Sequence, residues 1–148
     1  MIKKIGLVAI LMLLAMGCAI AEENSLSAES ANGGYIVTPA KDTGDLFPVI
    51  DAFDTIVQGE TNWHSRSVSS YMTTLRVDLN WGTPSNSLRL TIYTPDGYTL
   101  GPYYDSADGS VNGRICLDIT NPNGIARGTW SYRVYGYSVS GTQSYTIT

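Results

Sequence analysis

Residues 87–97 read Ser-Leu-Arg-Leu-Thr-Ile-Tyr-Thr-Pro-Asp-Gly, and residues 128–136 read Gly-Thr-Trp-Ser-Tyr-Arg-Val-Tyr-Gly. In both segments apolar and polar residues alternate with a period of two, which is typical of a β-strand with one buried face. Each run ends at a Pro, Asp or Gly, and these residues favour turns. Both segments therefore predict strands of antiparallel sheets.

The same alternation extends through most of the chain. It recurs in residues 75–81, 115–119 and 145–147, and turns rich in Gly, Pro, Asn and Asp separate the runs. No segment beyond the N-terminus shows the period of 3.6 residues that indicates an amphipathic helix. A sheet with one apolar face must bury that face against a second layer. We therefore predict an all-β domain over residues 47–148, an antiparallel β-sandwich of about eight strands with jelly-roll or Greek-key wiring.

The N-terminus has the features of a signal peptide. Lys3 and Lys4 precede the apolar residues 5–16, and residues 19–21, Ala-Ile-Ala, fit a cleavage site. The apolar run is shorter than the roughly 20 residues that span a bilayer. We expect residues 1–21 to be removed on export, which predicts a secreted or envelope-associated protein. A retained N-terminal anchor is the alternative.

The two cysteines raise separate questions. Residues 15–18, Ala-Met-Gly-Cys, resemble a lipoprotein cleavage box, in which Cys18 would carry a lipid and become the mature N-terminus. The alternative is that Cys18 is discarded with the signal peptide. In that case Cys116 is the remaining cysteine and no intramolecular disulfide can form. Its place in a strand pattern predicts a buried, structural thiol.

Residues 22–46 are rich in Ser, Ala, Asn, Gly and acidic residues, which predicts a flexible tether, although residues 35–37 could add an edge strand.

The whole chain has 9 Lys and Arg against 13 Asp and Glu, a net charge of −4. Removal of Lys3 and Lys4 with the signal peptide makes it −6. No basic cluster is visible, so we exclude nucleic acid as a partner, and membrane contact beyond a lipid anchor at Cys18.

Three segments together resemble the bacterial and archaeal pre-peptidase C-terminal domain family. They are residues 75–81, residues 87–97, and residues 121–137, where Asn-Pro, Gly-Thr-Trp and Val-Tyr-Gly follow in the family's order. The similarity covers about residues 54–148. It implies a non-catalytic jelly-roll-like sandwich that assists secretion, surface localisation or binding of matrix polymers, with calcium bound in some members. The proteases that usually accompany such domains also suggest an accessory or inhibitor of a separate secreted protease.

Catalytic residues are scarce. The chain has one histidine, His64, and no Gly-x-Ser-x-Gly sequence, so a Ser-His-Asp triad is not indicated. One histidine and one cysteine cannot supply the usual zinc ligands. We predict that the protein is not an enzyme and that calcium is the one cofactor to consider. Asp105 and Asp108 could offer it oxygens, as could a second group made of Asp51, Asp54 and Glu60. Solvated turns are the alternative for both groups.

Aromatic residues are the other candidates for function. The chain has 10 tyrosines and 3 tryptophans. Tyr98, Tyr103 and Tyr104 follow the central strand, whereas Tyr135 and Tyr137 lie opposite the predicted core face of their own strand. Exposed rings could stack on a polymer or anchor a protein partner, but loop tyrosines can also cover the end of a sandwich. We therefore predict an exported binding module for an extracellular polymer or envelope protein, with a passive structural role as the alternative.

Overall fold

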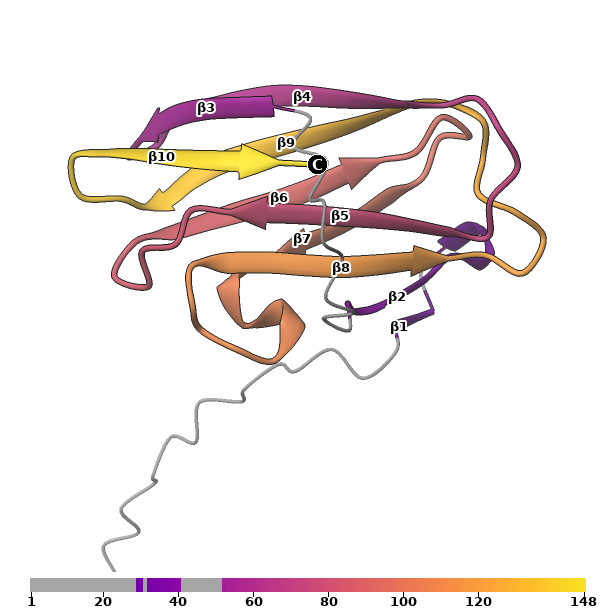
Figure 1. Ribbon diagram of the computed structural model, residues 1–148, viewed down its shortest axis with the longest axis horizontal. Helices are drawn as coiled ribbons and strands as arrows, with labels where there is room; N and C mark the ends of the chain where they lie inside the picture. Colours follow the sequence, from indigo (N-terminus) through magenta and orange to yellow (C-terminus); the bar gives the residue numbers. More distant parts are fainter. Residues whose placement is uncertain (1–28, 31, 41–51) are drawn as a thin grey trace, which may run out of the picture.

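The computed structural model describes residues 29–30, 32–40 and 52–148. These residues form two antiparallel sheets that pack face to face, which confirms the predicted all-β sandwich (Figure 1). The predicted signal peptide, Cys18 and Asp51 lie outside the described residues. Among the residues that are described, no helix is long and apolar enough to cross a membrane.

The strands divide unequally between the two sheets. The six-stranded sheet contains, in spatial order, β1 (Glu29–Ser30), β2 (Ile36–Pro39), β8 (Arg114–Thr120), β5 (Thr74–Asn80), β10 (Thr142–Ile147) and β3 (Ala52–Val57). The four-stranded sheet contains β4 (Thr61–Val68), β9 (Gly128–Ser138), β6 (Ser87–Tyr93) and β7 (Thr99–Tyr103). Two short 3-10 turns complete the described structure, η1 (Asn32–Gly34) and η2 (Asp105–Asp108).

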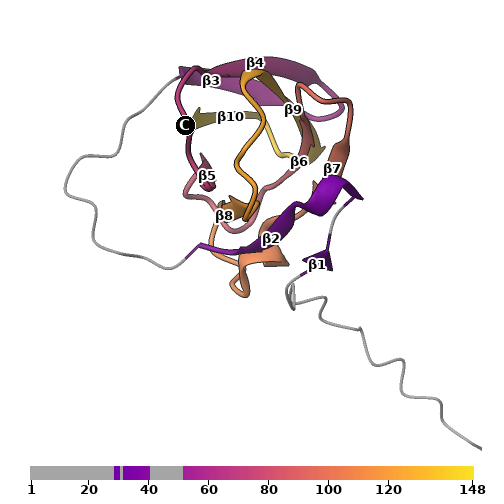
Figure 2. The same ribbon diagram turned by 90° about the vertical axis from the view of Figure 1, so that its right-hand side faces the viewer.

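The strands β3 to β10 are wired as a jelly roll. The first pairs with the last, β3 with β10, and the pairing then nests inward as β4 with β9, β5 with β8 and β6 with β7. Such nesting gives the two four-stranded layers of an eight-stranded jelly roll. Seen end-on, β5 and β8 lie across the interior from β6 and β7 (Figure 2). The remaining strands β2 and β1 extend one sheet beyond β8.

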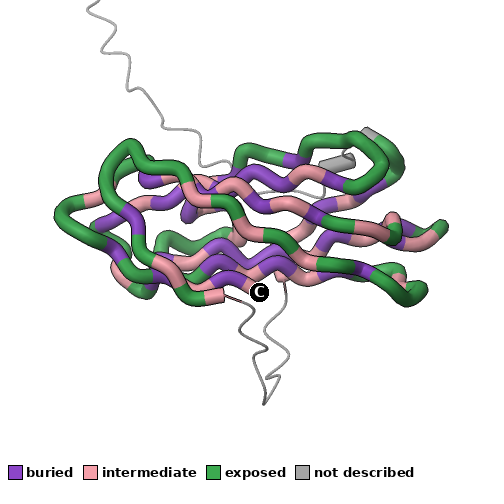
Figure 3. The backbone as a smooth tube through the Cα atoms, turned by 90° about the horizontal axis from the view of Figure 1, so that it is seen from above, coloured by how far each residue is buried: buried purple, intermediate pink, exposed green. Residues whose placement is uncertain are grey.

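The core lies between the sheets and follows the alternation of the sequence. Along most strands buried and more exposed residues alternate, as the coloured trace shows (Figure 3). The inward side chains of β6 are Leu88, Leu90 and Ile92, and those of β9 are Trp130, Tyr132 and Val134. Trp130 is completely buried, and its indole Nε1 donates a hydrogen bond to the carbonyl oxygen of Ala126 at 2.9 Å.

The predicted tether over residues 22–46 includes residues 32–40, which belong to the sandwich, in line with the alternative of an added strand at residues 35–37. Tyr35 and Val37 are buried in the core, and β2 pairs with β8. Gly33, at φ +83°, lets the chain turn in beneath the ring of Tyr98, where a Cβ atom would lie 2.5 Å from a ring carbon. The Tyr35 ring then packs edge-on against Trp130, with ring centroids 5.5 Å apart. The glycines that suggested flexibility thus permit a close approach.

Candidate functional site

The outer face of the four-stranded sheet gathers aromatic and arginine side chains. Because the even-numbered residues of β6 and β9 point into the core, their odd-numbered residues point outward. On β4 the outward set includes Trp63, whose side chain is 58% exposed. We call the following six residues the aromatic–arginine face: Trp63, Arg89, Tyr93, Arg133, Tyr135 and Tyr137.

Strand register brings Trp63, Arg133 and Tyr93 together. Trp63 on β4 is opposite Arg133 on β9, and Arg133 is opposite Thr91 on β6. The Trp63 and Tyr93 rings lie 5.4 Å apart at 37°, and the Arg133 guanidinium carbon is 5.9 Å from the centre of the Tyr93 ring. Three adjacent strands therefore contribute to one continuous patch.

A second group on the same face is built around Tyr135. Arg89 on β6 is paired with Tyr135 on β9. The guanidinium carbon of Arg89 lies 4.5 Å from the centre of the Tyr135 ring, which is a cation–π geometry. Farther along β9, Tyr137 is half-exposed and meets Tyr104 edge-on, with ring centroids 5.1 Å apart. Stacking holds these side chains in defined positions, which lowers the entropy that binding a ligand would cost.

The structure separates the tyrosines that the sequence grouped as one loop. Tyr103 is the last residue of β7 and is 5% exposed, so its ring packs in the core, as the packing alternative expects, and ligand binding by Tyr103 stays a prediction. Tyr98 packs against Gly33 and lies edge-on to Tyr35, at 6.2 Å. Of the three, Tyr104 adjoins the aromatic–arginine face. Ligand binding by Tyr98, Tyr104, Tyr135 and Tyr137 stays a prediction.

The carboxylates proposed for calcium hold the backbone of their own loop. Asp105 is buried, and its oxygens accept hydrogen bonds of 3.1–3.2 Å from the N–H groups of Asn112, Gly113 and Arg114. Asp108 accepts from the N–H groups of Ser110 and Cys116. In the described part of the chain no group of three or more His, Cys, Asp and Glu side chains could hold a metal ion. These contacts support the alternative that both carboxylates shape a turn, although Asp105 is buried rather than solvated.

The second proposed set of oxygens is occupied in the same way. The Glu60 carboxylate accepts a hydrogen bond from the N–H of Val57. Asp54 accepts from Thr55 N–H and from the Asn62 side-chain amide, and it lies 3.8 Å from His64 Nε2. Both carboxylates therefore act in the β3–β4 connection and its surroundings, and calcium binding by either set stays a prediction.

His64 is part of a polar cluster between the two sheets. Its Nε2 lies 2.7 Å from the hydroxyl oxygen of Tyr145, which also accepts a hydrogen bond from Asn62. Burial lowers the pKa of His64 from its usual value, and the Asp54 carboxylate opposes that shift. Burial also raises the pKa of Tyr145 to about 12, so Tyr145 remains a neutral hydroxyl that can donate to the imidazole.

We expect this arrangement to make folding stability depend on pH. With its pKa lowered in the folded state, His64 binds a proton more readily in the unfolded chain. The free energy of unfolding should therefore fall as the pH drops below about 6.5. Thermal melts of the wild type and of His64→Gln between pH 7.5 and 5 would measure this pH dependence of stability. The stability advantage of the wild type should shrink toward pH 5, and an advantage that stays constant would contradict the assignment.

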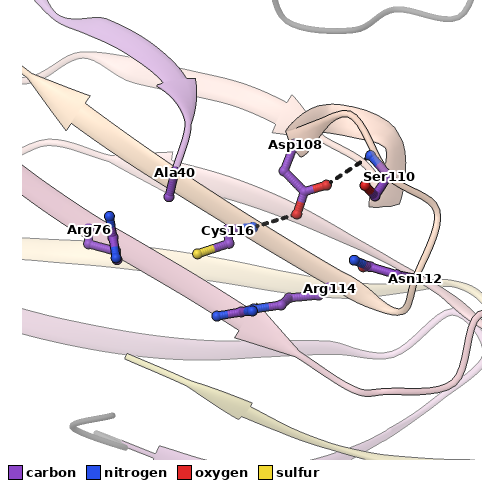
Figure 4. Close-up of a pocket in the computed structure, with 7 residues that line it drawn as sticks. All are labelled: Ala40, Arg76, Asp108, Ser110, Asn112, Arg114 and Cys116. Atoms are coloured by element: carbon purple, nitrogen blue, oxygen red, sulfur yellow. Dashed lines mark hydrogen bonds between the residues drawn. The ribbon is translucent and has the colours of Figure 1, made fainter. Parts of the chain in front are cut away.

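A pocket of about 200 Å³ opens on the outer face of the six-stranded sheet (Figure 4). Its lining includes Arg76, Arg114, Asp108 and the thiol of Cys116. Burial is the main cause that raises the pKa of Cys116 to about 11, so the thiol stays protonated at neutral pH. A protonated thiol is a poor nucleophile, which fits the structural role predicted for this residue.

Comparison with known proteins adds little on function. No family model matches the chain. Over 44 residues the chain is 52% identical to an uncharacterized protein of Archaeoglobus fulgidus, a match that covers 30% of this chain and 61% of that protein. The chain thus spans less than two thirds of the length of this relative. The resemblance to the pre-peptidase C-terminal domain family stays a prediction.

Trp63, Tyr93 and Arg89 were not among the sequence-based candidates. Alternation along 87–93 already places Arg89 and Tyr93 opposite Leu88, Leu90 and Ile92. The sequence does not show which strands pair with each other. In the sheet β4 and β6 lie on either side of β9, although β9 is distant from both in the sequence. The signal that could have found these residues is their type, since large aromatic side chains on the predicted outward face of a strand are candidates for binding.

Proposed function

We propose that this protein is an exported, non-catalytic module that binds an extracellular polymer on its aromatic–arginine face. The observation that carries the proposal is the exposure of Trp63 beside Tyr93 on the outer face of the four-stranded sheet. Aromatic rings in such a position offer apolar area to the faces of sugar rings or other planar groups at low entropic cost. Export is supported by the signal-peptide features of residues 1–21.

The shape of the site favours a polymer over a small molecule. Small ligands are usually held in concave pockets that bury most of their surface. The aromatic–arginine face spans three neighbouring strands, which are spaced about 4.8 Å apart, so an extended chain can contact several of its residues at once. Many weak contacts of this kind add up when they are made simultaneously.

The test is a binding assay with Trp63→Ala. In pull-downs on a panel of neutral and acidic polysaccharides, we expect the wild type to bind at least one polymer. Loss of an exposed stacking ring that contacts the ligand should weaken binding about tenfold or more. Phe53→Ala is the matched control, because Phe53 is 70% exposed but lies on the opposite sheet. Absence of binding to every polymer, or equal loss in both variants, would refute the proposal.

A further inference from the structure

Positive charge is concentrated on the same sheet as the exposed rings. The four strands β4, β9, β6 and β7 contain no Asp, Glu or Lys. Arg89 and Arg133 lie on their outer face, whereas Arg66 faces the other sheet and donates to the carbonyl oxygen of Arg76 at 3.3 Å. The chain as a whole is acidic, with a net charge of −4. A basic surface on an acidic protein favours an anionic ligand at that surface.

The arginines of the two sheets differ in their partners. On the six-stranded sheet, Arg76 forms an ion pair with Asp118 at 2.8 Å and Arg114 forms one with Asp78 at 2.7 Å. Arg89 and Arg133 have no carboxylate partner among the described residues. Arg133 donates only to the Thr91 hydroxyl, at 3.4 Å, and Arg89 Nε is buried without a hydrogen-bond partner in this part of the chain. Within the described part of the chain, neither guanidinium charge is therefore neutralised by a carboxylate.

We propose that the polymer bound by the aromatic–arginine face is a polysaccharide that carries carboxylates, of the uronic-acid type. This inference rests on the proposed function and names the ligand class for the same site. A guanidinium presents a planar fork of N–H donors that matches a carboxylate, and stacking on Tyr135 and Tyr93 orients the two forks in advance. The exposed Trp63 ring then supports the apolar face of a sugar ring.

The number and spacing of the charges favour this class over other anions. Arg89 and Arg133 occupy diagonal positions on neighbouring strands, which places their backbones about 7–8 Å apart. Two cations at this spacing suit carboxylates that recur along a chain. A nucleic acid is usually held through many more phosphate contacts, and an anionic membrane through a cluster of about 4–8 basic residues.

The experiment compares polygalacturonic acid with its methyl ester, which keeps the sugar chain and removes the charge. We expect the full chain to bind the acid about tenfold or more tightly than the ester, the factor that one lost charge-assisted pair produces. Arg89→Gln combined with Arg133→Gln should lower affinity for the acid and leave that for the ester unchanged. Trp63→Ala should weaken both, and Arg127→Gln, an exposed arginine outside the strands, should change neither.

Three results would overturn the inference. Equal affinity for acid and ester, with both sensitive to Trp63→Ala, would leave the proposed function standing but remove the carboxylates from it. Binding to neutral polymers alone would likewise leave the proposed function standing and rule out recognition of carboxylates. Binding of polyglutamate as tightly as polygalacturonate would show that charge alone is recognised and that sugar is not. Melting temperatures of the arginine variants equal to that of the wild type would establish that any loss comes from the face itself.

Discussion

Replacing Trp130 with Ala should lower the free energy of unfolding by about 3–5 kcal/mol, the usual cost of removing a large buried aromatic side chain. Trp130 is completely buried and contacts Tyr35 edge-on. The substitution leaves a cavity between the sheets and an Ala126 carbonyl without its indole donor. Small domains have about 5–15 kcal/mol of stability in total, so the variant should be near unfolding at physiological temperature.

Urea denaturation followed by circular dichroism measures this change, and Trp63→Ala provides the matched control. The exposed Trp63 ring contributes little to stability, so its removal should cost less than about 1 kcal/mol. The two substitutions should therefore have different effects, because Trp130 is needed for folding and Trp63 for binding. A Trp130→Ala variant as stable as Trp63→Ala would mean that Trp130 is not at the centre of the core.

Replacing Asp105 with Ala should destabilise the protein by about 3 kcal/mol, because one buried and two partly buried N–H groups would lose a charged acceptor. The three N–H groups involved belong to Asn112, Gly113 and Arg114. They hold a turn in which Gly113 packs against the backbone of Gly82 and Thr83, so closely that a Cβ atom would lie 2.5 Å from Thr83 N. Without the carboxylate, both the turn and this backbone contact should loosen.

Ser106→Ala is the control, since it lies in the same 3-10 turn and its backbone carbonyl still accepts the N–H of Gly109. Thermal melts with calcium and with a chelator complete the experiment. If the carboxylates of Asp105 and Asp108 serve only the backbone, calcium should leave the melting temperature unchanged. A rise in the melting temperature with calcium would instead show that a cation binds and would support Asp105 and Asp108 as its ligands. An Asp105→Ala variant as stable as Ser106→Ala would contradict the structural role.

Much of the fold could be predicted because strand alternation is a local property. Residues 87–93 of the first quoted segment form β6, and residues 128–136 lie within β9. The apolar residues of these runs face the core as the period of two requires. The burial of Tyr103 shows where local signals fail. Gly101 and Pro102 suggested a loop, but β7 is an edge strand, which can accommodate a proline, and its last ring turns into the core.

The candidate site was harder to predict, because its residues meet only through pairing between distant strands. Tyr135 and Tyr137 were recognised as outward-facing from their own strand. Nothing local shows that Arg89 covers Tyr135, or that Trp63 reaches Tyr93 across β9. The pairing also decides charge, since it collects arginines without carboxylates on one sheet and pairs the arginines of the other sheet with aspartates.

The amino-acid sequence alone was enough to establish the strands, their buried faces and the sandwich class, because a period of two is readable over a few residues. The nested order of the strands, the inclusion of residues 32–40 and the position of Tyr103 emerged only in the folded chain. These features depend on contacts between residues far apart in sequence, whose free energy is gained only when the two sheets close over a common core. The aromatic–arginine face belongs to the same category, since it exists only where β4, β9 and β6 lie side by side.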